Sequence, residues 1–263
     1  MRMDQTTHIQ PHVDHEAYTS ARPPIIDQFG RTFNYLRIAV NEKCNLRCIY
    51  CMPEKGVPFK PKNEILTTKE ILRVVKVVSY LGVNKIRFTG GEPLLRGDIV
   101  KLVGKSSSTP GIESIHLTTN GVLLGRYARN LKEAGLTGVN ISIDTLNPEK
   151  FLQITRRDEL VRAMEGLEAA KTAGIPFIKV NAVALRGFND NEIVEFVELT
   201  KDYPLTVRFI ELMPFDAHQI WKTGKFFSAE HIQKELKGHF PDIKTTDGTA
   251  TEHAIFQVPN YAG

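Results

Sequence analysis

Three cysteines, Cys44, Cys48 and Cys51, stand within the eight-residue stretch CNLRCIYC, and the chain of 263 residues has no other cysteine. Their spacing, Cys-x3-Cys-x2-Cys, is tight enough for one loop to surround one metal centre. An odd number of thiols does not make a closed disulfide framework, and the N-terminus does not read as a secretory signal. We therefore expect a reducing, cytoplasmic compartment, where clustered thiols indicate metal binding or redox chemistry.

The number of thiols separates the possible metal sites. A structural zinc site normally takes four protein ligands, and no histidine lies in or near this stretch. Thiolates also suit iron–sulfur clusters, and each of the four irons of a [4Fe-4S] cluster takes a ligand besides the cluster sulfides. Three cysteines would leave one iron open to a small molecule. A redox pair at Cys48 and Cys51, incomplete zinc ligation and chance remain alternatives from the spacing alone.

Composition describes an ordinary globular protein, with 41% hydrophobic and 24% charged residues. The 34 basic and 30 acidic residues leave a net charge of +4. So mild an excess does not indicate a nucleic-acid partner. No apolar run approaches the roughly 18 residues that a membrane span needs, so no membrane partner is expected either.

The first 24 residues are polar and end in two prolines. We expect residues 1–24 to form a disordered tail. Three histidines in it, His8, His12 and His15, are a weak candidate for a metal site. Acidic residues in the same segment argue against a mitochondrial transit peptide.

Short β-rich runs alternate with longer amphipathic runs from residue 36 onward. Strands are expected at 36–40, 85–91, 114–121, 138–145, 177–183 and 206–214. Helices are expected near 67–81, 98–107, 123–134, 158–173, 191–202 and 228–237. The clearest helix is the first, because its apolar residues fall on one face and Thr67 and Glu70 form a capping-box pattern.

This alternation predicts an α/β protein with parallel strands joined by right-handed crossovers. Six units could build a doubly wound sheet or a barrel of the TIM kind, either full or partial. Both folds place active sites at the carboxyl ends of the strands. We expect the core domain to span residues 25–237.

Four expected strands carry a basic residue between apolar neighbours: Arg37, Arg87, Lys179 and Arg208. Side chains alternate between the faces of a strand, so these cations converge if their neighbours pack against the outer helices. An unpaired buried charge costs several kcal/mol, and the main acidic residues of the strands are Asp144 and Glu211. A polyanion such as a nucleoside triphosphate would balance the cations. Alternatively, the cations reach the barrel rim or pair internally.

Two further features stand at strand ends. In TGGEP (89–93), adjacent glycines let the main chain approach a ligand, although a tight strand–helix turn explains Gly90 and Gly91 equally well. Small polar residues follow at the ends of two later strands: Thr118, Asn120, Ser142 and Asp144. They could bind ribose or carboxylate groups, or cap the following helices.

Together, the cysteine loop, the GGEP loop and the strand–helix repetition resemble the radical S-adenosylmethionine (SAM) superfamily, in which a CxxxCxxC loop follows the first strand of a partial TIM barrel. Over about residues 27 to 263 the chain is more closely similar to the GTP 3′,8-cyclase (MoaA) family of molybdenum cofactor biosynthesis. The segments that carry this similarity are DQFGR, LRIAVNEKCNLRCIYCMPEKG, IRFTGGEPLLR, LTTNGVLL, VNISIDTLNPEKF and VRFIELMP.

The resemblance implies a partial (βα)6 barrel and a radical SAM lyase that converts GTP to (8S)-3′,8-cyclo-7,8-dihydroguanosine 5′-triphosphate. In that family the open iron chelates SAM, whose cleavage gives a 5′-deoxyadenosyl radical that removes a hydrogen atom from C3′ of the ribose. The resemblance also implies a flavodoxin- or ferredoxin-type electron donor and is compatible with a homodimer.

Residue roles follow from the same resemblance. The cluster ligands would be Cys44, Cys48 and Cys51. The SAM-binding residues would be Tyr50, Gly91, Ser142 and Met213. The GTP-binding residues would be Arg37, Arg87, Thr118, Lys179 and Arg208. No side chain is expected to be catalytic itself, because the cluster and SAM generate the radical.

The chain departs from the family pattern in one respect. The family has a second [4Fe-4S] cluster near its C-terminus and ends in Gly-Gly, whereas this chain has no cysteine after Cys51 and ends in VPNYAG. We therefore expect one cluster, which binds SAM, and residues 238–263 as the start of a truncated C-terminal region. The alternatives are a naturally short, one-cluster radical SAM enzyme with another substrate, and a non-catalytic nucleotide- or zinc-binding relic.

Overall fold

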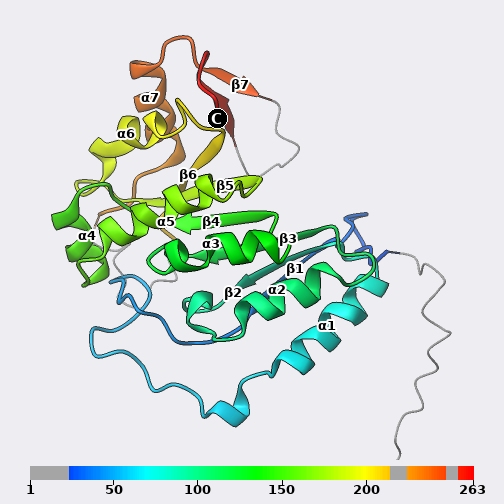
Figure 1. Cartoon of the computed structure of the whole chain (residues 1–263). Helices are drawn as coiled ribbons and strands as arrows, with labels where there is room; N and C mark the ends of the chain where they lie inside the picture. Colours follow the sequence, from blue (N-terminus) through cyan, green and yellow to red (C-terminus); the bar gives the residue numbers. More distant parts are fainter. Residues whose placement is uncertain (1–23, 214–223, 247–253) are drawn as a thin grey trace, which may run out of the picture.

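A computed structural model of the chain describes residues 24–213, 224–246 and 254–263. The expected tail and its three histidines lie outside these ranges, apart from Pro24. A six-stranded sheet runs in the order β1-β2-β3-β4-β5-β6, and all neighbouring strands are parallel. Helices follow the strands along the chain and cover the sheet (Figure 1).

The six expected strands and the six expected helices are confirmed, with ends that shift by a few residues. The strands are β1 (Tyr35–Ala39), β2 (Lys85–Thr89), β3 (Ser114–Thr119), β4 (Gly138–Ser142), β5 (Phe177–Ala184) and β6 (Leu205–Glu211). The corresponding helices are α1 (Thr68–Tyr80), α2 (Ile99–Ser107), α3 (Leu124–Glu133), α5 (Leu160–Thr172), α6 (Ile193–Glu198) and α7 (Ala229–His239).

The sequence reading missed several short elements. They are α4 (Pro148–Thr155), the antiparallel pair β7 (Lys244–Thr246) and β8 (Ile255–Gln257), and the short helices η2 (Lys62–Glu64), η3 (Pro93–Leu95) and η4 (Asp190–Glu192). The helix expected near 191–202 is present as η4 followed directly by α6, and it ends at Glu198, before the expected end.

The strand order decides between the two folds that the strand–helix alternation left open, and it confirms the partial barrel that the resemblance implies. In a doubly wound sheet the order reverses at a switch point, whereas here it follows the sequence throughout. Right-handed crossovers that always step in one direction place their helices on one face, and α1, α2, α3 and α5 lie side by side along the sheet (Figure 1). Within the described residues β1 and β6 do not pair, so the architecture is a partial (βα)6 barrel.

Alternating side chains divide the sheet into an apolar face and a polar face. The apolar face packs against the helices in one core that includes Ile86, Phe88, Leu117, Val139, Ile141 and Val180. Each of these side chains is buried, and burial of one such side chain stabilises the fold by roughly 1.5–3 kcal/mol. Along each strand, the residues that alternate with these apolar side chains lie on the opposite face of the sheet, which we call the inner face.

Local sequence explains where the two helices nearest the cysteine loop begin. The capping box of α1 is confirmed: the Glu70 N–H donates to Thr67 Oγ1 at 3.3 Å, and the Thr67 N–H donates to the Glu70 carboxylate at 2.7 Å. At α4, Asn147 Oδ1 accepts from the Lys150 N–H at 3.1 Å and Pro148 takes the first helical position. Asn-Pro before a helix is a start signal that the sequence reading overlooked.

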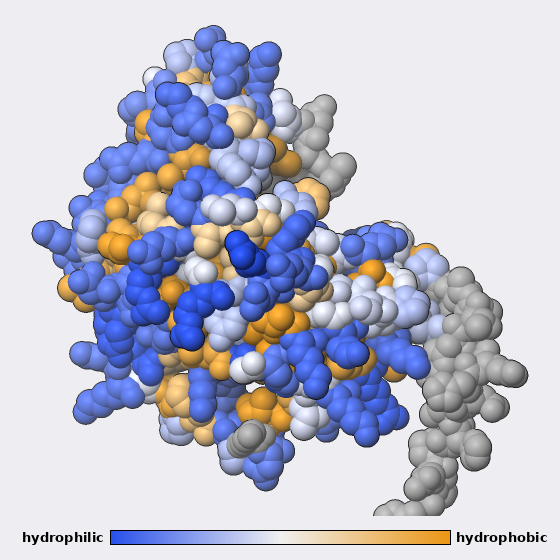
Figure 2. Space-filling model, in the orientation of Figure 1, coloured by the Kyte–Doolittle hydropathy of each residue, from blue (hydrophilic) through white to orange (hydrophobic). Residues whose placement is uncertain are grey.

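The surface in Figure 2 is mostly hydrophilic, with separate hydrophobic patches. For the part of the chain that the structure describes, every helix is too short or too polar to cross a membrane. Neither observation identifies a partner.

Candidate functional site

The cysteine loop lies at the carboxyl end of the sheet, directly after β1. Cys44 and Cys48 are half-buried and Cys51 is exposed. The Cys48 carbonyl accepts from the N–H groups of Cys51 and Met52 at 3.1 and 3.0 Å. This tight turn places Cys48 and Cys51 close enough for each thiol to shift the pKa of the other.

Main-chain bonds hold the loop against the end of α4. The N–H groups of Arg47 and Ile49 donate to the carbonyls of Thr155 and Ile154, both at 2.9 Å. Arg156 follows α4 in the left-handed conformation, with φ of 54°. Its Nη1 donates to the Arg47 carbonyl at 2.9 Å, so the missed helix α4 is part of the frame that shapes the cysteine loop.

The thiols differ in their protonation. The hydrogen bond from Cys48 lowers the pKa of Cys51, and the same bond, followed by burial, raises the pKa of Cys48. Burial raises the pKa of Cys44. Among the residues described, no three His, Cys, Asp or Glu side chains are close enough to ligate a single metal ion. A polynuclear iron–sulfur cluster does not need its thiols to converge on one ion, because each cysteine binds a different iron.

The GGEP loop packs against the segment that leads into Cys44. The Gly91 N–H donates to the Asn41 carbonyl at 3.0 Å, and the Glu92 N–H donates to the Lys43 carbonyl at 2.7 Å. A Cβ on Gly90 would lie 2.4 Å from the Asn41 oxygen, and one on Gly91 would lie 2.3 Å from the Lys43 oxygen. Only glycine fits such an approach of two main-chain segments.

Glu92 is a buried residue that the sequence reading did not single out. Its carboxylate accepts from Thr119 Oγ1 at 2.7 Å, from the Asn120 N–H at 2.8 Å and from the Leu94 N–H at 3.0 Å. Burial raises the pKa of Glu92, and these three hydrogen bonds oppose that shift. The carboxylate therefore ties the GGEP loop to the end of β3. A carboxylate between Gly-Gly and Pro-Leu-Leu was the signal available in the sequence.

Asn120, predicted at a strand end, lies beside the cysteine loop. Its Nδ2 donates to Asn45 Oδ1 at 2.8 Å and to Cys44 Sγ at 3.8 Å. The Leu46 N–H also donates to this sulfur, at 3.4 Å. Hydrogen bonds to a sulfur favour the thiolate form that binds iron.

Tyr50 and Asp144 form a buried pair at the same end of the barrel. The Tyr50 hydroxyl donates to Asp144 Oδ2, and the Val183 N–H donates to Oδ1 at 2.9 Å. Burial raises the pKa of both side chains. Asp144, a candidate counter-ion for the strand cations, therefore holds the cysteine loop instead.

The convergence of basic strand residues is confirmed by the register of the sheet. Residues paired across parallel strands share a face. The inner face shows three successive rows of such partners, counted from the amino toward the carboxyl ends of the strands. The first row is Arg37, Arg87 and His116. The second is Thr118, Asn140 and Lys179, and the third is Ser142, Asn181 and Arg208.

The cations of the inner face have no carboxylate partners. Within the described ranges no ion pair involves Arg37, Lys85, Arg87, Lys179 or Arg208. The alternative of internal pairing is therefore wrong for this part of the chain. Arg37 is exposed, as a rim position would be, whereas Arg87, Lys179 and Arg208 are half-buried.

Burial and mutual repulsion act on the titration of these groups. Burial, followed by the charge of Arg208, lowers the pKa of Lys179. Burial also lowers the pKa of Arg87, whose guanidinium lies 5.1 Å from the centre of the Tyr35 ring. Burial and the nearby cations lower the pKa of His116 to about 4, so its imidazole is neutral at neutral pH.

Several buried polar atoms on the inner face also have no hydrogen-bond partner among the described residues. They are Tyr35 Oη, Arg87 Nε, Asn140 Oδ1 and Asn181 Oδ1. Leaving a buried polar group unpaired costs about 1–3 kcal/mol, so such groups are rare unless a ligand or water satisfies them. Unpaired cations beside unpaired polar atoms describe a binding site for a polar anion.

The predicted SAM-binding residues lie at one end of the barrel. Tyr50 is in the loop after β1, Gly91 follows β2, Ser142 ends β4 and Met213 stands two residues beyond β6. Met213 is 58% exposed, next to the buried Leu212. These positions share the carboxyl end of the barrel with the cysteine loop. Most of the predicted GTP-binding residues lie in rows nearer the amino ends, whereas Arg208 stands in the same row as Ser142.

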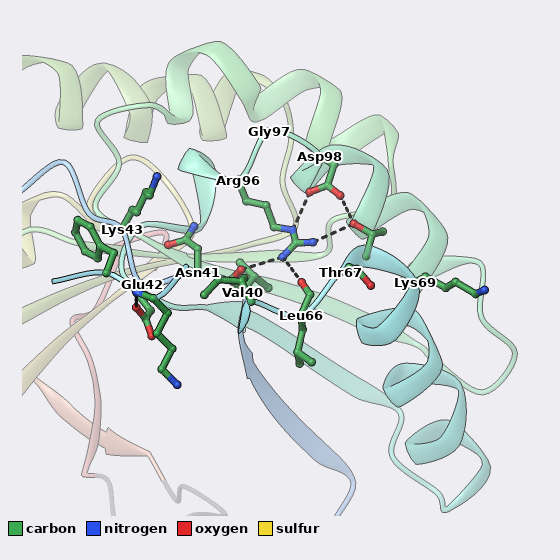
Figure 3. Close-up of a pocket in the computed structure, with 14 residues that line it drawn as sticks. Val40, Asn41, Glu42, Lys43, Leu66, Thr67, Lys69, Arg96, Gly97 and Asp98 are labelled. Carbon is green, nitrogen blue, oxygen red and sulfur yellow. Dashed lines mark hydrogen bonds and ion pairs between the residues drawn. The ribbon is translucent and has the colours of Figure 1, made fainter. Parts of the chain in front are cut away.

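A separate cavity of about 690 Å³ lies next to the cysteine loop, lined by residues 40–43, 65–69 and 96–98 together with Phe59 and Lys60 (Figure 3). Arg96 closes one side. Its guanidinium donates to Asp98 Oδ1 at 2.7 Å, to the Val40 carbonyl at 2.9 Å and to the Leu66 carbonyl at 3.0 Å. None of the predicted site residues lines this cavity, and the bonds of Arg96 to Val40 and Leu66 join the loop before α1 to the barrel.

Comparison with known proteins gives a family for this arrangement. The profile described as the Radical SAM superfamily matches residues 38–200, which is more than half of the chain. A GTP 3′,8-cyclase of Chlorobaculum tepidum is 46% identical over 239 residues, which cover 91% of this chain and 72% of that protein. Molybdenum cofactor biosynthesis protein 1 of Mus musculus is 45% identical over 240 residues, covering 91% of this chain and 38% of that protein.

Solved structures show the same fold at low identity. TYW1 with a lysine-pyruvate adduct has a TM-score of 0.61 at 17% identity, covering 86% of this chain and 80% of that chain. SuiB of Streptococcus suis bound to S-adenosylmethionine has a TM-score of 0.59 at 17% identity, covering 79% of this chain and 48% of that chain. From the profile match and the identity to the cyclases, the chain belongs to the radical SAM superfamily and, within it, to the GTP 3′,8-cyclase family.

Proposed function

We propose that this chain binds GTP on the inner face of the barrel and converts it to the 3′,8-cyclo nucleotide in molybdenum cofactor biosynthesis. The observation that carries the proposal is the group of unpaired cations beside unpaired buried polar atoms on that face. A triphosphate supplies the missing negative charge, and a nucleoside supplies hydrogen-bonding groups for the remaining atoms. The identity to named GTP 3′,8-cyclases supports the choice of nucleotide.

A [4Fe-4S] cluster and SAM are the cofactors of this superfamily. We propose that Cys44, Cys48 and Cys51 hold the cluster, because the main-chain bonds of their loop already gather the thiols at the barrel end. When bound, the cluster and SAM supply the radical that removes a hydrogen atom from the substrate. The protein binds, orients and shields the reactants.

Four residues around the rim are the proposed SAM contacts: Tyr50, Gly91, Ser142 and Met213. The close packing of Gly91 against Lys43 holds the GGEP main chain beside the cysteine loop, where it can bond the amino group of SAM. The hydroxyl of Tyr50 is occupied by Asp144, so we expect its ring and main chain to form the contact.

The proposed GTP contacts occupy the inner face: Arg37, Arg87, Thr118, Lys179 and Arg208. We expect the phosphates near Arg37 and Arg87, which are the proposed contacts most distant from the cysteine loop, and the sugar closer to that loop. This orientation brings the reacting carbon toward the end of the barrel that carries the cluster ligands.

The reaction needs an electron from outside the chain, for which we propose a flavodoxin- or ferredoxin-type donor. A cytoplasmic location and a homodimer are further proposals. Size measurement of the reconstituted protein by light scattering tests the second of these.

The test of function is anaerobic reconstitution with iron and sulfide, followed by incubation with SAM and a reductant in the presence and absence of GTP. We expect 5′-deoxyadenosine to form, and GTP to be consumed. A Cys48→Ala variant should produce neither. SAM cleavage that is indifferent to GTP would indicate another substrate, and no cleavage by the iron-loaded protein would contradict the radical mechanism for this chain.

A further inference from the structure

Asn140 stands at the centre of β4, between the buried core residues Val139 and Ile141. Because those two side chains pack toward the helices, the Asn140 side chain faces the inner face. The residue is 2% exposed, and its Oδ1 has no hydrogen-bond partner among the described residues. It is therefore a buried amide that nothing in the described fold explains.

The immediate neighbours of Asn140 do not satisfy its oxygen. Thr118 and Lys179 flank it in the same row, and Gly138 and Ser142 precede and follow it on the same face of β4. None of them donates a hydrogen bond to Oδ1. An apolar side chain of similar size would avoid the cost of burying an unpaired amide, which indicates that the amide is needed by a ligand.

The position of the row says which part of a nucleotide would meet this amide. Successive residues of a strand rise by about 3.3 Å, so rows two residues apart are separated by roughly 6.6 Å. The Arg37 and Arg87 row lies one step toward the amino ends, and the cysteine loop lies beyond the carboxyl ends. A nucleotide with its phosphates on the two arginines and its reacting sugar toward the cysteine loop places that sugar beside Asn140.

We propose that Asn140 is a substrate-binding residue that recognises a hydroxyl of the ribose and so selects ribonucleotides over deoxyribonucleotides. The inference rests on the proposed function, in which the inner face binds a nucleoside triphosphate. A hydroxyl both donates and accepts, and an amide presents one group of each kind, so the two are chemically matched. The amide can turn over to present either group, so the match does not depend on which atom faces the sugar.

Equilibrium binding to the reconstituted protein without reductant tests the proposal, because no turnover then occurs. The probes are GTP, 2′-deoxyGTP, 3′-deoxyGTP and inorganic tripolyphosphate. The variants are Asn140→Leu, which removes the amide at similar volume, and Asn140→Ser, which retains a small hydroxyl. Asn130→Leu on the exposed surface of α3 is the matched control.

We expect the wild type to bind GTP about tenfold more tightly than at least one of the deoxy analogues, the ratio typical of one net hydrogen bond. In Asn140→Leu that ratio should fall to about one, through weaker binding of GTP, while the Kd for tripolyphosphate stays unchanged. Asn140→Ser should retain part of the preference, and Asn130→Leu all of it. If Asn140→Leu does not fold, loss of part of the preference in Asn140→Ser carries the same test.

Three results would overturn the inference: no ribose preference in the wild type, a preference that persists in Asn140→Leu, or a proportional loss of tripolyphosphate binding in that variant. Failure of the proposed function gives a different result. In that case the wild type binds neither GTP nor tripolyphosphate measurably, and the proposed role of Asn140 is also contradicted because it depends on nucleotide binding.

Discussion

Arg37 and Arg87 are direct register partners on the parallel strands β1 and β2, and both face the interior of the barrel without a carboxylate from the described chain between them. Like charges directly opposite in a sheet are destabilising. The Tyr35 ring, 5.1 Å from the Arg87 guanidinium, compensates only in part. We therefore expect this pair to cost the fold stability when no anion is bound beside it.

The first prediction concerns the effect of the Arg87 charge on stability and on anion binding. Arg87→Met removes the charge and keeps an apolar stem of similar length. We expect the melting temperature to rise by about 2–4 °C, which corresponds to roughly 1 kcal/mol in a domain of this size, while tripolyphosphate binding weakens at least tenfold. Calorimetry provides both values. Arg73→Met on the exposed face of α1 is the control and should change neither the melting temperature nor tripolyphosphate binding. If Arg87→Met melts at a lower temperature and still binds tripolyphosphate, Arg37 and Arg87 are not a site of repulsion.

The second prediction uses two glycines of the segment after β2. A Cβ on Gly91 would lie 2.3 Å from the Lys43 carbonyl oxygen, whereas a Cβ on Gly97 would have nothing within 4 Å. Gly91→Ala should push the GGEP loop away from the segment before Cys44 and reduce the iron and sulfide retained after reconstitution by more than half. Gly97→Ala should retain the wild-type amount. Equal iron content in the two variants would argue against the packing role assigned to Gly91.

The third prediction concerns pH. The pKa of His116 is lowered to about 4, below the ordinary value of 6.5, mainly by burial and then by nearby cations. The unfolded chain therefore binds more protons in this window, so stability falls as the pH decreases from 6.5 toward 4, by on the order of 2–3 kcal/mol from this residue. Urea unfolding at several pH values should show a shallower fall in His116→Gln. The exposed His239→Gln is the control, and curves that run parallel for wild type and His116→Gln would refute the assignment.

The fourth prediction concerns the buried carboxylate of Glu92. Glu92→Gln keeps the shape but replaces one acceptor by an NH2 group that opposes an existing donor, either the Asn120 N–H or the groups on Thr119 and Leu94. Stability should decrease by about 2–3 kcal/mol in urea unfolding. Glu133→Gln at the exposed end of α3 should leave the free energy of unfolding unchanged. If Glu92→Gln leaves the free energy of unfolding unchanged, the Glu92 carboxyl group is protonated in the folded protein.

The faces of the strands were predictable because they depend on a local rule. Alternation with a period of two puts Arg37, Arg87, Lys179 and Arg208 opposite their apolar neighbours whatever the strand order. The order itself decides between a doubly wound sheet and a partial barrel, and it depends on pairings between distant segments. No local pattern contains that information, so the alternation left both folds open, and only the family resemblance predicted the partial barrel.

The missed parts of the site have a common physical cause. Tyr50 and Asp144 are separated by 94 residues, and Glu92 and Asn120 by 28, so their hydrogen bonds follow from the folded partial barrel. Helix α4 has 8 residues, too few for a clear helical period, although its Asn-Pro start was visible. The roles of the SAM- and GTP-binding residues stay predictions.

The hydrogen bonds from Arg47 and Ile49 to the end of α4 join main-chain atoms, and the bond from Tyr50 to Asp144 joins two side chains that carry no sulfur. These bonds would support the shape of the cysteine loop before any cluster binds, unlike a zinc finger, which is unfolded without its metal. If the three cysteines hold a cluster as proposed, we expect that cluster to enter a chain that is already folded. Oxidative loss of the metal should leave a chain that can be recharged without passing through denaturation.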